Sequence, residues 1–252
     1  MVIPPASASR PEPRAAISAH RGGSESAPPG TYEAYESALA VGADLLEFDV
    51  RRTADGQLVA FHDPRLGPGR PVAVLSYADL CRLAGYEVPT VTGVLRLLAG
   101  RAGAHIDLKE RDCLGPVAVE ALSVLEPARI IVTTGDEAAV SELRSRFPAV
   151  PCGLTIGGDL AQTGRYLTGR VRRRVRSRVD AVTAVNADWA VVHERLAEAG
   201  VLAECRRSGL ATMVWTVNDD SAMARWLSSP DVDVLVTDRP GRAAELRRSA
   251  DR

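Results

Sequence analysis

The sequence predicts an α/β fold in which eight parallel strands separated by helices close into one TIM-type barrel, with a β-hairpin extension after the second strand. Apolar strand-like runs alternate with helical patterns along the chain, which is typical of parallel β/α architecture. The length of 252 residues suits one closed eight-stranded barrel. An open doubly wound sheet is the structural alternative. The lack of a G-x-G-x-x-G motif after the first predicted strand weakens that alternative.

The predicted elements follow one another in a regular order. The predicted barrel strands are Ala16–His20, Leu45–Val50, Ala104–Leu108, Arg129–Thr134, Cys152–Ile156, Ala181–Val185, Ala211–Val217 and Val232–Thr237. The predicted helices are Thr31–Val41, Tyr77–Leu83, Val91–Ala99, Pro116–Leu125, Glu137–Phe147, Leu160–Val179, Trp189–Ala199 and Ser221–Leu227. The run Leu58–His62 is the predicted hairpin strand.

Composition excludes several function classes. A hydrophobic content of 46%, a charged content of 25% and a net charge of −1 describe an ordinary globular protein without a global attraction to nucleic acid or membranes. No apolar run approaches the roughly 20 residues that span a bilayer, so we expect no transmembrane segment. We therefore expect a small-molecule partner and no nucleic acid. The composition says nothing about the oligomeric state.

The N-terminus and the cysteines bear on location. Residues 1–14 are rich in Pro, Ala and Ser and lack an apolar signal core, which predicts a disordered tail before a single domain over 15–252. We expect a cytoplasmic protein, with export through an unusual or removed leader as the alternative. The four cysteines are scattered and form no C-x-x-C motif, which indicates free thiols rather than a zinc site or a disulfide framework.

A hairpin brings chemistry-bearing residues together early in the chain. Asp55-Gly56 lies between the second strand and the hairpin strand and is a strong turn signal. If these two residues form the whole loop, Asp49 faces His62 across the hairpin and Glu47 lies on the same face. A longer turn shifts this register, and a polar, solvent-facing hairpin is the alternative.

Further polar residues lie where barrel strands end. His20 ends the first predicted strand, and His105, Asp107 and Lys109 share one face of the third because they are spaced two residues apart. Catalytic residues of such barrels lie at the carboxyl ends of strands. Imidazoles exchange protons near neutral pH, and clustered carboxylates bind hard cations, so the pattern favours a metal-assisted acid/base enzyme. A structural ion pair of Asp107 and Lys109 is the alternative.

Single residues elsewhere carry weaker signals. Lys109 is the only lysine among 31 basic residues, which indicates a position that needs a compact ammonium unless its survival is chance. Trp215 either forms a wall of a substrate pocket or is simply packed. Asp238 is a candidate N-cap of the final helix. The basic stretch Arg170–Arg178 favours a solvated outer helix, with a contact to anionic headgroups or a partner as the alternative.

Together these segments resemble the glycerophosphodiester phosphodiesterase family over nearly the whole chain after the tail. The matching motifs begin at His20-Arg21-Gly22, Glu47-Phe48-Asp49, Thr53-Ala54-Asp55-Gly56, His62-Asp63, Val88-Pro89-Thr90, Ile106-Asp107-Leu108-Lys109, Val214-Trp215-Thr216 and Thr237-Asp238-Arg239-Pro240. The resemblance implies an eight-stranded β/α barrel that hydrolyses glycerophosphodiesters to glycerol 3-phosphate and an alcohol. It also implies Mg²⁺ or Ca²⁺ as the cofactor and a small phosphodiester as the substrate.

The resemblance also implies a role for each matching residue. The metal ligands are Glu47, Asp49 and Asp107; the acid/base pair is His20 and His62, in an order that is left open; the phosphate-binding residues are Arg21 and Lys109. We add Trp215, as a pocket wall, and His105 to the expected substrate-binding residues. An oxygen-only ligand set suits a hard cation. The implied nucleophile is the substrate's own neighbouring hydroxyl, which gives a cyclic phosphate that water later opens.

Three departures from the family pattern concern the mouth and the ligands. Pro29-Gly30 stands where the family usually has Glu-Asn, which puts the usual substrate contacts in question. Asp107 replaces the usual Glu, as in the related sphingomyelinase D-like barrels. His105 replaces a common Asn, and we expect it to contact substrate. Two other functions therefore stay open: a phosphodiesterase for another substrate, such as a lysophospholipase D-like enzyme, and an inactive barrel that binds a phosphodiester.

Overall fold

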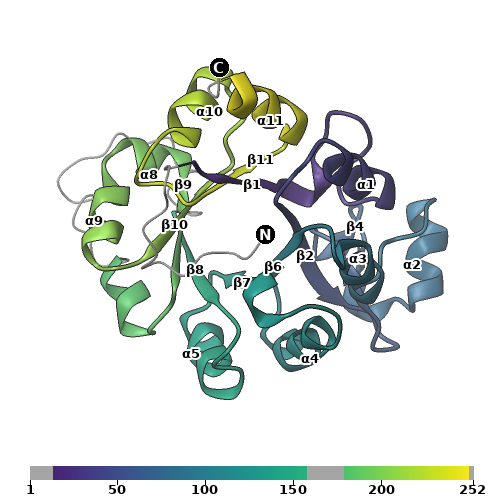
Figure 1. Ribbon diagram of the computed structural model, residues 1–252. Coiled ribbons are helices and arrows are strands. Elements are labelled where there is room, and N and C mark those ends of the chain that lie inside the picture. Colours follow the sequence, from purple (N-terminus) through teal and green to yellow (C-terminus); the bar gives the residue numbers. More distant parts are fainter. Residues whose placement is uncertain (1–13, 158–178, 250–252) are drawn as a thin grey trace.

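The computed structural model describes residues 14–157 and 179–249, and in this part of the chain eight parallel strands close into a ring (Figure 1). In ring order they are β1 (Ala16–Ala19), β2 (Leu45–Arg52), β6 (Gly103–Leu108), β7 (Ile130–Thr134), β8 (Cys152–Ile156), β9 (Trp189–His193), β10 (Ala211–Trp215) and β11 (Val234–Thr237). Parallel pairing of β1 with both β11 and β2 closes the ring. The predicted eight-stranded TIM-type barrel is confirmed.

Helices surround the ring and connect its strands (Figure 1). Those that lie wholly within the described residues are α1 (Tyr32–Ala40), α2 (Tyr77–Ala84), α3 (Val91–Leu98), α4 (Leu114–Val124), α5 (Glu137–Arg146), α8 (Glu194–Glu198), α9 (Val201–Arg207), α10 (Asp220–Leu227) and α11 (Pro240–Ser249). Short 3₁₀ turns are η1 (His20–Gly22), η2 (Val72–Val74), η3 (Arg111–Cys113) and η4 (Pro127–Arg129). Side-chain caps begin several helices, as Thr31 does for α1. Among the described residues, no helix has the length and apolarity to cross a bilayer.

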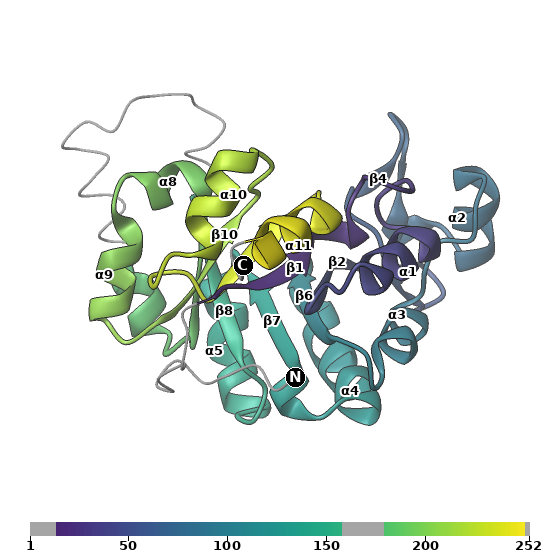
Figure 2. The ribbon, with the colours of Figure 1, turned by 45° about the horizontal axis from the view of Figure 1, so that its top comes forward.

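The chain after β2 leaves the ring and builds a small side lobe. It contains β3 (Leu58–Ala60), which pairs antiparallel with β2, the two-stranded sheet of β4 (Arg65–Leu66) and β5 (Arg70–Pro71), and α2. Figure 2 shows β4 and α2 to one side of the barrel. A separate apolar cluster around Val59, Leu75 and Leu80 holds this lobe together. The predicted hairpin extension is therefore present.

The register of that hairpin differs from the prediction by one residue. Val50 pairs with Ala60 and Arg52 with Leu58, so Asp49 does not face His62 directly. The turn is longer than two residues because the Thr53 N–H bonds to the Gln57 carbonyl, with Gly56 at a φ of 86° inside the loop. A glycine at positive φ is typical of three-residue hairpin loops. His62 follows β3 rather than belonging to it.

One strand and one helix were predicted in the wrong places. Residues 181–184 of the predicted strand Ala181–Val185 are helical, and the strand β9 lies at Trp189–His193, where a helix was predicted. Short apolar runs do not distinguish a buried strand from a helix, and β9 is a continuous apolar run of the kind that parallel strands carry. The predicted helix Leu160–Val179 and its basic stretch Arg170–Arg178 lie outside the described residues, apart from Val179, as does the predicted tail, apart from Arg14.

Two apolar cores lie on the two faces of the ring. The outer core, between strands and helices, contains the outward residues of β2 and β6, among them Phe48 and Ile106. The inner core fills the barrel with large side chains, among them Trp189 and Met213. Strand alternation therefore leaves the inward positions near the carboxyl ends of the strands for polar residues.

Candidate active site

A cavity of about 450 Å³ opens at the carboxyl ends of the barrel strands. Residues of the predicted site that line it are His20, Glu47, Asp49, His62, His105, Asp107, Lys109 and Trp215. Thr133, Thr134, Gly135, Asp136, Thr155, Leu108, Val191 and Val236 complete the lining. The structure thus gathers eight of the nine predicted site residues around one cavity. The ninth residue, Arg21, contributes its backbone N–H, which donates to Glu47 Oε2.

His20 is held by a carboxylate from the far end of the chain. Its Nδ1 lies 2.7 Å from Asp238 Oδ1, and Asn218 Nδ2 donates to the other oxygen of Asp238 at 2.6 Å. Burial disfavours the imidazolium, but the Asp238 hydrogen bond and the charge of Glu47 outweigh it, so the pKa of His20 is raised. With Nδ1 bonded to Asp238, Nε2 is the nitrogen left for proton exchange. Asp238 therefore orients His20 rather than capping the final helix.

We expect Asp238→Asn to lower the pKa of His20, because burial then acts without the carboxylate that opposes it. In the wild type the raised pKa means that protonated His20 stabilises the fold below its ordinary pKa of 6.5, and this contribution is lost as pH rises through the folded-state value. The variant should lose that acid-side stabilisation. Histidine ¹H–¹³C NMR titration of the metal-free protein measures the shift. An unchanged His20 midpoint would contradict it.

A tight turn places His20 and Arg21 at the mouth of the barrel. Arg21 has a φ of 50° and Gly22 a φ of 80°, and the Gly22 Cα lies against the start of α1. A Cβ added at Gly22 would come within 2.8 Å of the Ala34 carbonyl carbon and within 2.9 Å of the Tyr35 ring. The turn therefore needs glycine for both its conformation and its close approach.

We expect Gly22→Ala to destabilise the protein by about 3 kcal/mol and to lower activity, because strain and overpacking act together beside His20. Gly100→Ala is the matched control, since Gly100 has a φ of 75° and open space around its Cβ position. That control should cost only about 1 kcal/mol. Urea unfolding of both variants measures the difference. Equal losses would show that the contact with α1 is unimportant.

Three carboxylates meet on the floor of the cavity. Glu47 and Asp49 point inward from β2 and Asp107 from β6, and one oxygen of each lies within 4.8 Å of the others. The Arg21 backbone N–H donates to Glu47 Oε2 at 2.9 Å. Lys109 Nζ lies 2.9 Å from Asp49 Oδ1 and also pairs with Asp107. The side chain of Arg21 adds a buried Nε without a hydrogen-bond partner in the described structure.

The raised pKa values and the unsatisfied oxygen of these carboxylates favour the binding of a cation. Burial, and then the charge of Asp49, raise the pKa of Glu47 to about 8, and burial raises the pKa of Asp107. Burial opposes the charge on Lys109, but Asp107 and Asp49 raise its pKa. Asp49 Oδ2 is buried and, within the described residues, has no hydrogen-bond partner. The oxygen-only donors and this unsatisfied oxygen fit a divalent hard cation.

His105 lies beneath the carboxylates in a buried chain of hydrogen bonds. The Thr133 hydroxyl donates to Asp107 Oδ1 at 3.1 Å, so Thr133 accepts from His105 Nε2 at 3.1 Å, and His105 Nδ1 accepts from Ser18 at 3.0 Å. Burial lowers the pKa of His105 to about 3, which keeps the ring neutral. Both ring nitrogens are therefore occupied by the protein, and substrate contact by His105 stays a prediction.

His62 and Trp215 also line the cavity. The His62 side chain is 46% exposed, and its Nδ1 lies 2.8 Å from Asp63 Oδ1. Trp215 Nε1 donates to the Val191 carbonyl at 3.3 Å, and its ring packs edge-on against His193. Trp215 is thus both packed and part of the cavity wall. Its contact with substrate stays a prediction, as do those of Arg21 and Lys109.

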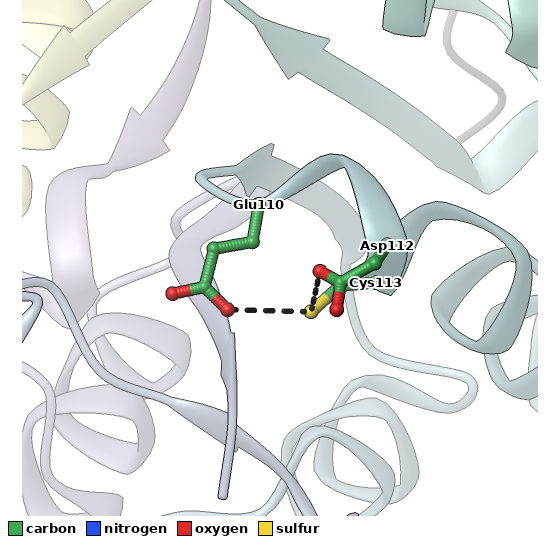
Figure 3. A group of neighbouring side chains, drawn as sticks. All are labelled: Glu110, Asp112 and Cys113. Carbon is green, nitrogen blue, oxygen red and sulfur yellow. Dashed lines mark hydrogen bonds between the residues drawn. The ribbon is translucent and has the colours of Figure 1, made fainter. Parts of the chain in front are cut away.

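A second acidic group lies just beyond β6 (Figure 3). Glu110 and Asp112 flank the Cys113 thiol, which donates weakly to both carboxylates. Glu110 Oε1 also pairs with Arg51 at 2.7 Å, and Asp112 pairs with Arg52. Because arginines neutralise both carboxylates, this group differs from the three carboxylates of the cavity, where one oxygen is left unsatisfied.

Comparisons with known proteins agree with this geometry. The Glycerophosphoryl diester phosphodiesterase family matches the chain over residues 20–93 and 100–242. A glycerophosphodiester phosphodiesterase from Caldanaerobacter subterraneus is 24% identical over 254 residues, covering 92% of this chain and 97% of the relative. The crystal structure of a glycerophosphodiester phosphodiesterase from Agrobacterium tumefaciens is 29% identical, with a TM-score of 0.71 and coverage of 91% and 99%. A phosphodiesterase from Oleispira antarctica, solved with the product sn-glycerol-3-phosphate, shares the fold at 17% identity, with a TM-score of 0.70 and coverage of 95% and 98%.

Proposed function

Because the chain belongs to the glycerophosphoryl diester phosphodiesterase family, we propose that His20 and His62 carry out its reaction beside a divalent cation held by Glu47, Asp49 and Asp107. The protein is a phosphoric diester hydrolase that converts glycerophosphodiesters to glycerol 3-phosphate and an alcohol. The observation that carries the residue assignment is the meeting of two imidazoles and three carboxylates at one cavity.

The two histidines divide the proton transfers. One imidazole takes a proton from the attacking hydroxyl, and the other gives a proton to the leaving alkoxide. The Asp238 hydrogen bond fixes the ring orientation of His20, which leaves Nε2 toward the reaction. His62 reaches the same cavity from a different element, after β3. A phosphodiester bound in this cavity therefore has one imidazole to accept a proton and one to donate a proton.

Cationic groups stabilise the negative charge on the phosphoryl oxygens. The bound cation supplies Lewis-acid stabilisation of negative charge on these oxygens. Lys109 lies among the carboxylates and lines the cavity, and the Arg21 side chain keeps a buried N–H without a partner. Both side chains hold the phosphate by charge-assisted hydrogen bonds. Trp215 provides an apolar wall for the rest of the substrate. His105 is a buried residue of the cavity lining.

Mg²⁺ or Ca²⁺ is the proposed cation, because carboxylate oxygens suit both ions. We also propose that residues 15–252 act as one domain and that the protein works in the cytoplasm. Free cysteines at all four positions are typical of a reducing compartment. Fractionation of the native cells tests the location.

A substrate panel tests the proposed function. The purified protein is assayed against glycerophosphodiesters and lysophospholipids of different headgroups, with and without a chelator and with added Mg²⁺ or Ca²⁺. We expect release of glycerol 3-phosphate that the chelator abolishes and one of the cations restores. Faster turnover of lysophospholipids would instead assign a lysophospholipase D-like substrate. Absence of turnover with metal supplied would favour a barrel that only binds a phosphodiester.

A further inference from the structure

Arg51 connects β2 to the loop that carries His62. The residue is 8% exposed and continues the inward alternation of Glu47 and Asp49. Its Nε and Nη2 both donate to the His62 carbonyl oxygen, at 3.0 and 2.9 Å. Its Nη1 donates to Glu110 Oε1 at 2.7 Å. One guanidinium therefore holds the backbone of His62 by two bonds and is itself held by a third.

His62 needs such an anchor because regular pairing ends before it. The ladder between β2 and β3 reaches Ala60, and the Phe61 N–H still bonds to the Asp49 carbonyl at 2.9 Å. Beyond that point the His62 imidazole bonds to its own neighbour, Asp63, which belongs to the same exposed loop. Among the described residues, the hydrogen bonds from Arg51 therefore join the backbone of His62 to the barrel.

The ion pair between Arg51 and Glu110 also supports a role for Arg51 in holding the His62 loop. A largely buried guanidinium is costly unless it is paired, and Glu110 supplies the opposite charge. Glu110 directly follows Lys109 beyond β6. Arg51 therefore fixes the His62 loop relative to the strand end that carries Asp107 and Lys109. Hydrophobic residues would stabilise the same position without this geometric link, so the pair is better explained by positioning than by stability.

We propose that Arg51 is a positioning residue that sets His62 for proton transfer, with Glu110 holding Arg51 in place. The proposal rests on the proposed role of His62 and adds to it the device that places this imidazole. A misplacement of about 1 Å in a catalytic group can cost up to 100-fold in rate, which is the scale of effect expected here.

A double-mutant cycle tests the proposal. Arg51→Met should lower kcat for a glycerophosphodiester by about 10- to 100-fold in the wild type and by less than about twofold in a His62→Ala background. The backbone carbonyl of residue 62 remains in His62→Ala, so a loss that acts through the fold as a whole would appear in both backgrounds. Equal losses in the two backgrounds, or no loss in the wild type, would overturn the proposal.

A spectroscopic readout separates this proposal from the proposed function. In ¹H–¹³C spectra, Arg51→Met should shift the ring resonance of His62 and leave that of His193 in place, whereas the control Arg52→Met should shift neither. Arg52 is the next residue along and pairs with Asp112 on the exposed surface. An unmoved His62 resonance overturns the positioning role whether or not His62 is catalytic. Full activity of His62→Ala would instead refute the proposed function.

A second variant covers the case in which Arg51→Met fails to fold, as judged by circular dichroism. Glu110→Ala leaves β2 intact and frees the guanidinium of Arg51 from its partner. It should reproduce the His62 resonance shift and a smaller loss of kcat that again disappears in the His62→Ala background. Retention of the wild-type resonance and kcat in Glu110→Ala would then overturn the proposal.

Discussion

We expect replacement of either His20 or His62 with alanine to lower kcat/KM for a glycerophosphodiester by about 10²- to 10⁴-fold, the range that positioned acid/base groups contribute. The two imidazoles enter the cavity from different elements, one after β1 and the other after β3. Under the proposed mechanism, each variant removes one of the two proton transfers that cleavage of an alkyl phosphodiester needs. Steady-state kinetics with an alkyl leaving group measures both losses.

The leaving group distinguishes the two histidines. A nitrophenolate leaves without protonation, so a nitrophenyl phosphodiester restores much of the rate to the variant that lacks the general acid and little to the variant that lacks the base. His193→Ala is the control, because His193 lies outside the lining of the cavity and packs against Trp215. Its effect should stay below about tenfold. Losses of similar size in all three variants would contradict the assignment.

We expect Asp49→Asn to abolish binding of the divalent cation and to lower activity by at least about 10²-fold. The change keeps the shape of the side chain and removes the charge of the carboxylate whose Oδ2 is buried without a partner in the described structure. It also leaves Lys109 with one carboxylate partner instead of two. Calorimetric titration of Mg²⁺ and Ca²⁺ into the chelator-treated protein measures the binding directly.

The second acidic group provides the matched control for this experiment. Asp112 belongs to the group with Glu110 and Cys113, and Asp112→Asn removes one carboxylate there. Because arginines already neutralise that group, the variant should bind the cation as the wild type does and show the same rise in melting temperature with added metal. Loss of cation binding in Asp112→Asn, with retention in Asp49→Asn, would show that the cation binds at the second acidic group instead.

The alternation of polar and apolar residues was sufficient to predict much of the site. In β6, His105 and Asp107 face inward while Ile106 packs against the helices, as a period of two requires. The same period in β2 places Glu47 and Asp49 on the floor of the cavity. These positions depend only on the local backbone and on burial of the apolar face, so they could be read without tertiary information.

His62 lines the same cavity as the three carboxylates, as predicted, but the predicted pairing of His62 with Asp49 was wrong. The one-residue shift of the hairpin register came from a three-residue loop, which Asp55-Gly56 alone does not distinguish from a two-residue loop. His62 still reaches the cavity because the chain leaves the ladder after Ala60 and turns toward the mouth. The register of the hairpin alone does not determine the position of His62, because His62 lies beyond the paired residues.

Two polar contacts were missed because they join distant parts of the chain. Asp238 bonds to His20 across 218 positions of sequence, and Arg51 bonds to Glu110 across 59. The inward alternation of Val234 and Val236 continues to Asp238, and that signal would have placed its carboxylate at the mouth. For Arg51, the same alternation gives the direction of the side chain but no indication of its partners.

Metal-dependent hydrolysis is tested most directly by ³¹P NMR of glycerophosphocholine incubated with the purified protein, with a divalent cation or with excess chelator. We expect the resonance of glycerol 3-phosphate to grow only with the cation, either directly or after a cyclic phosphate intermediate. We also expect His20→Ala and Asp49→Asn to leave the substrate resonance unchanged over the same time. Equal turnover in chelator, or release of phosphocholine in place of glycerol 3-phosphate, would contradict metal-dependent hydrolysis to glycerol 3-phosphate.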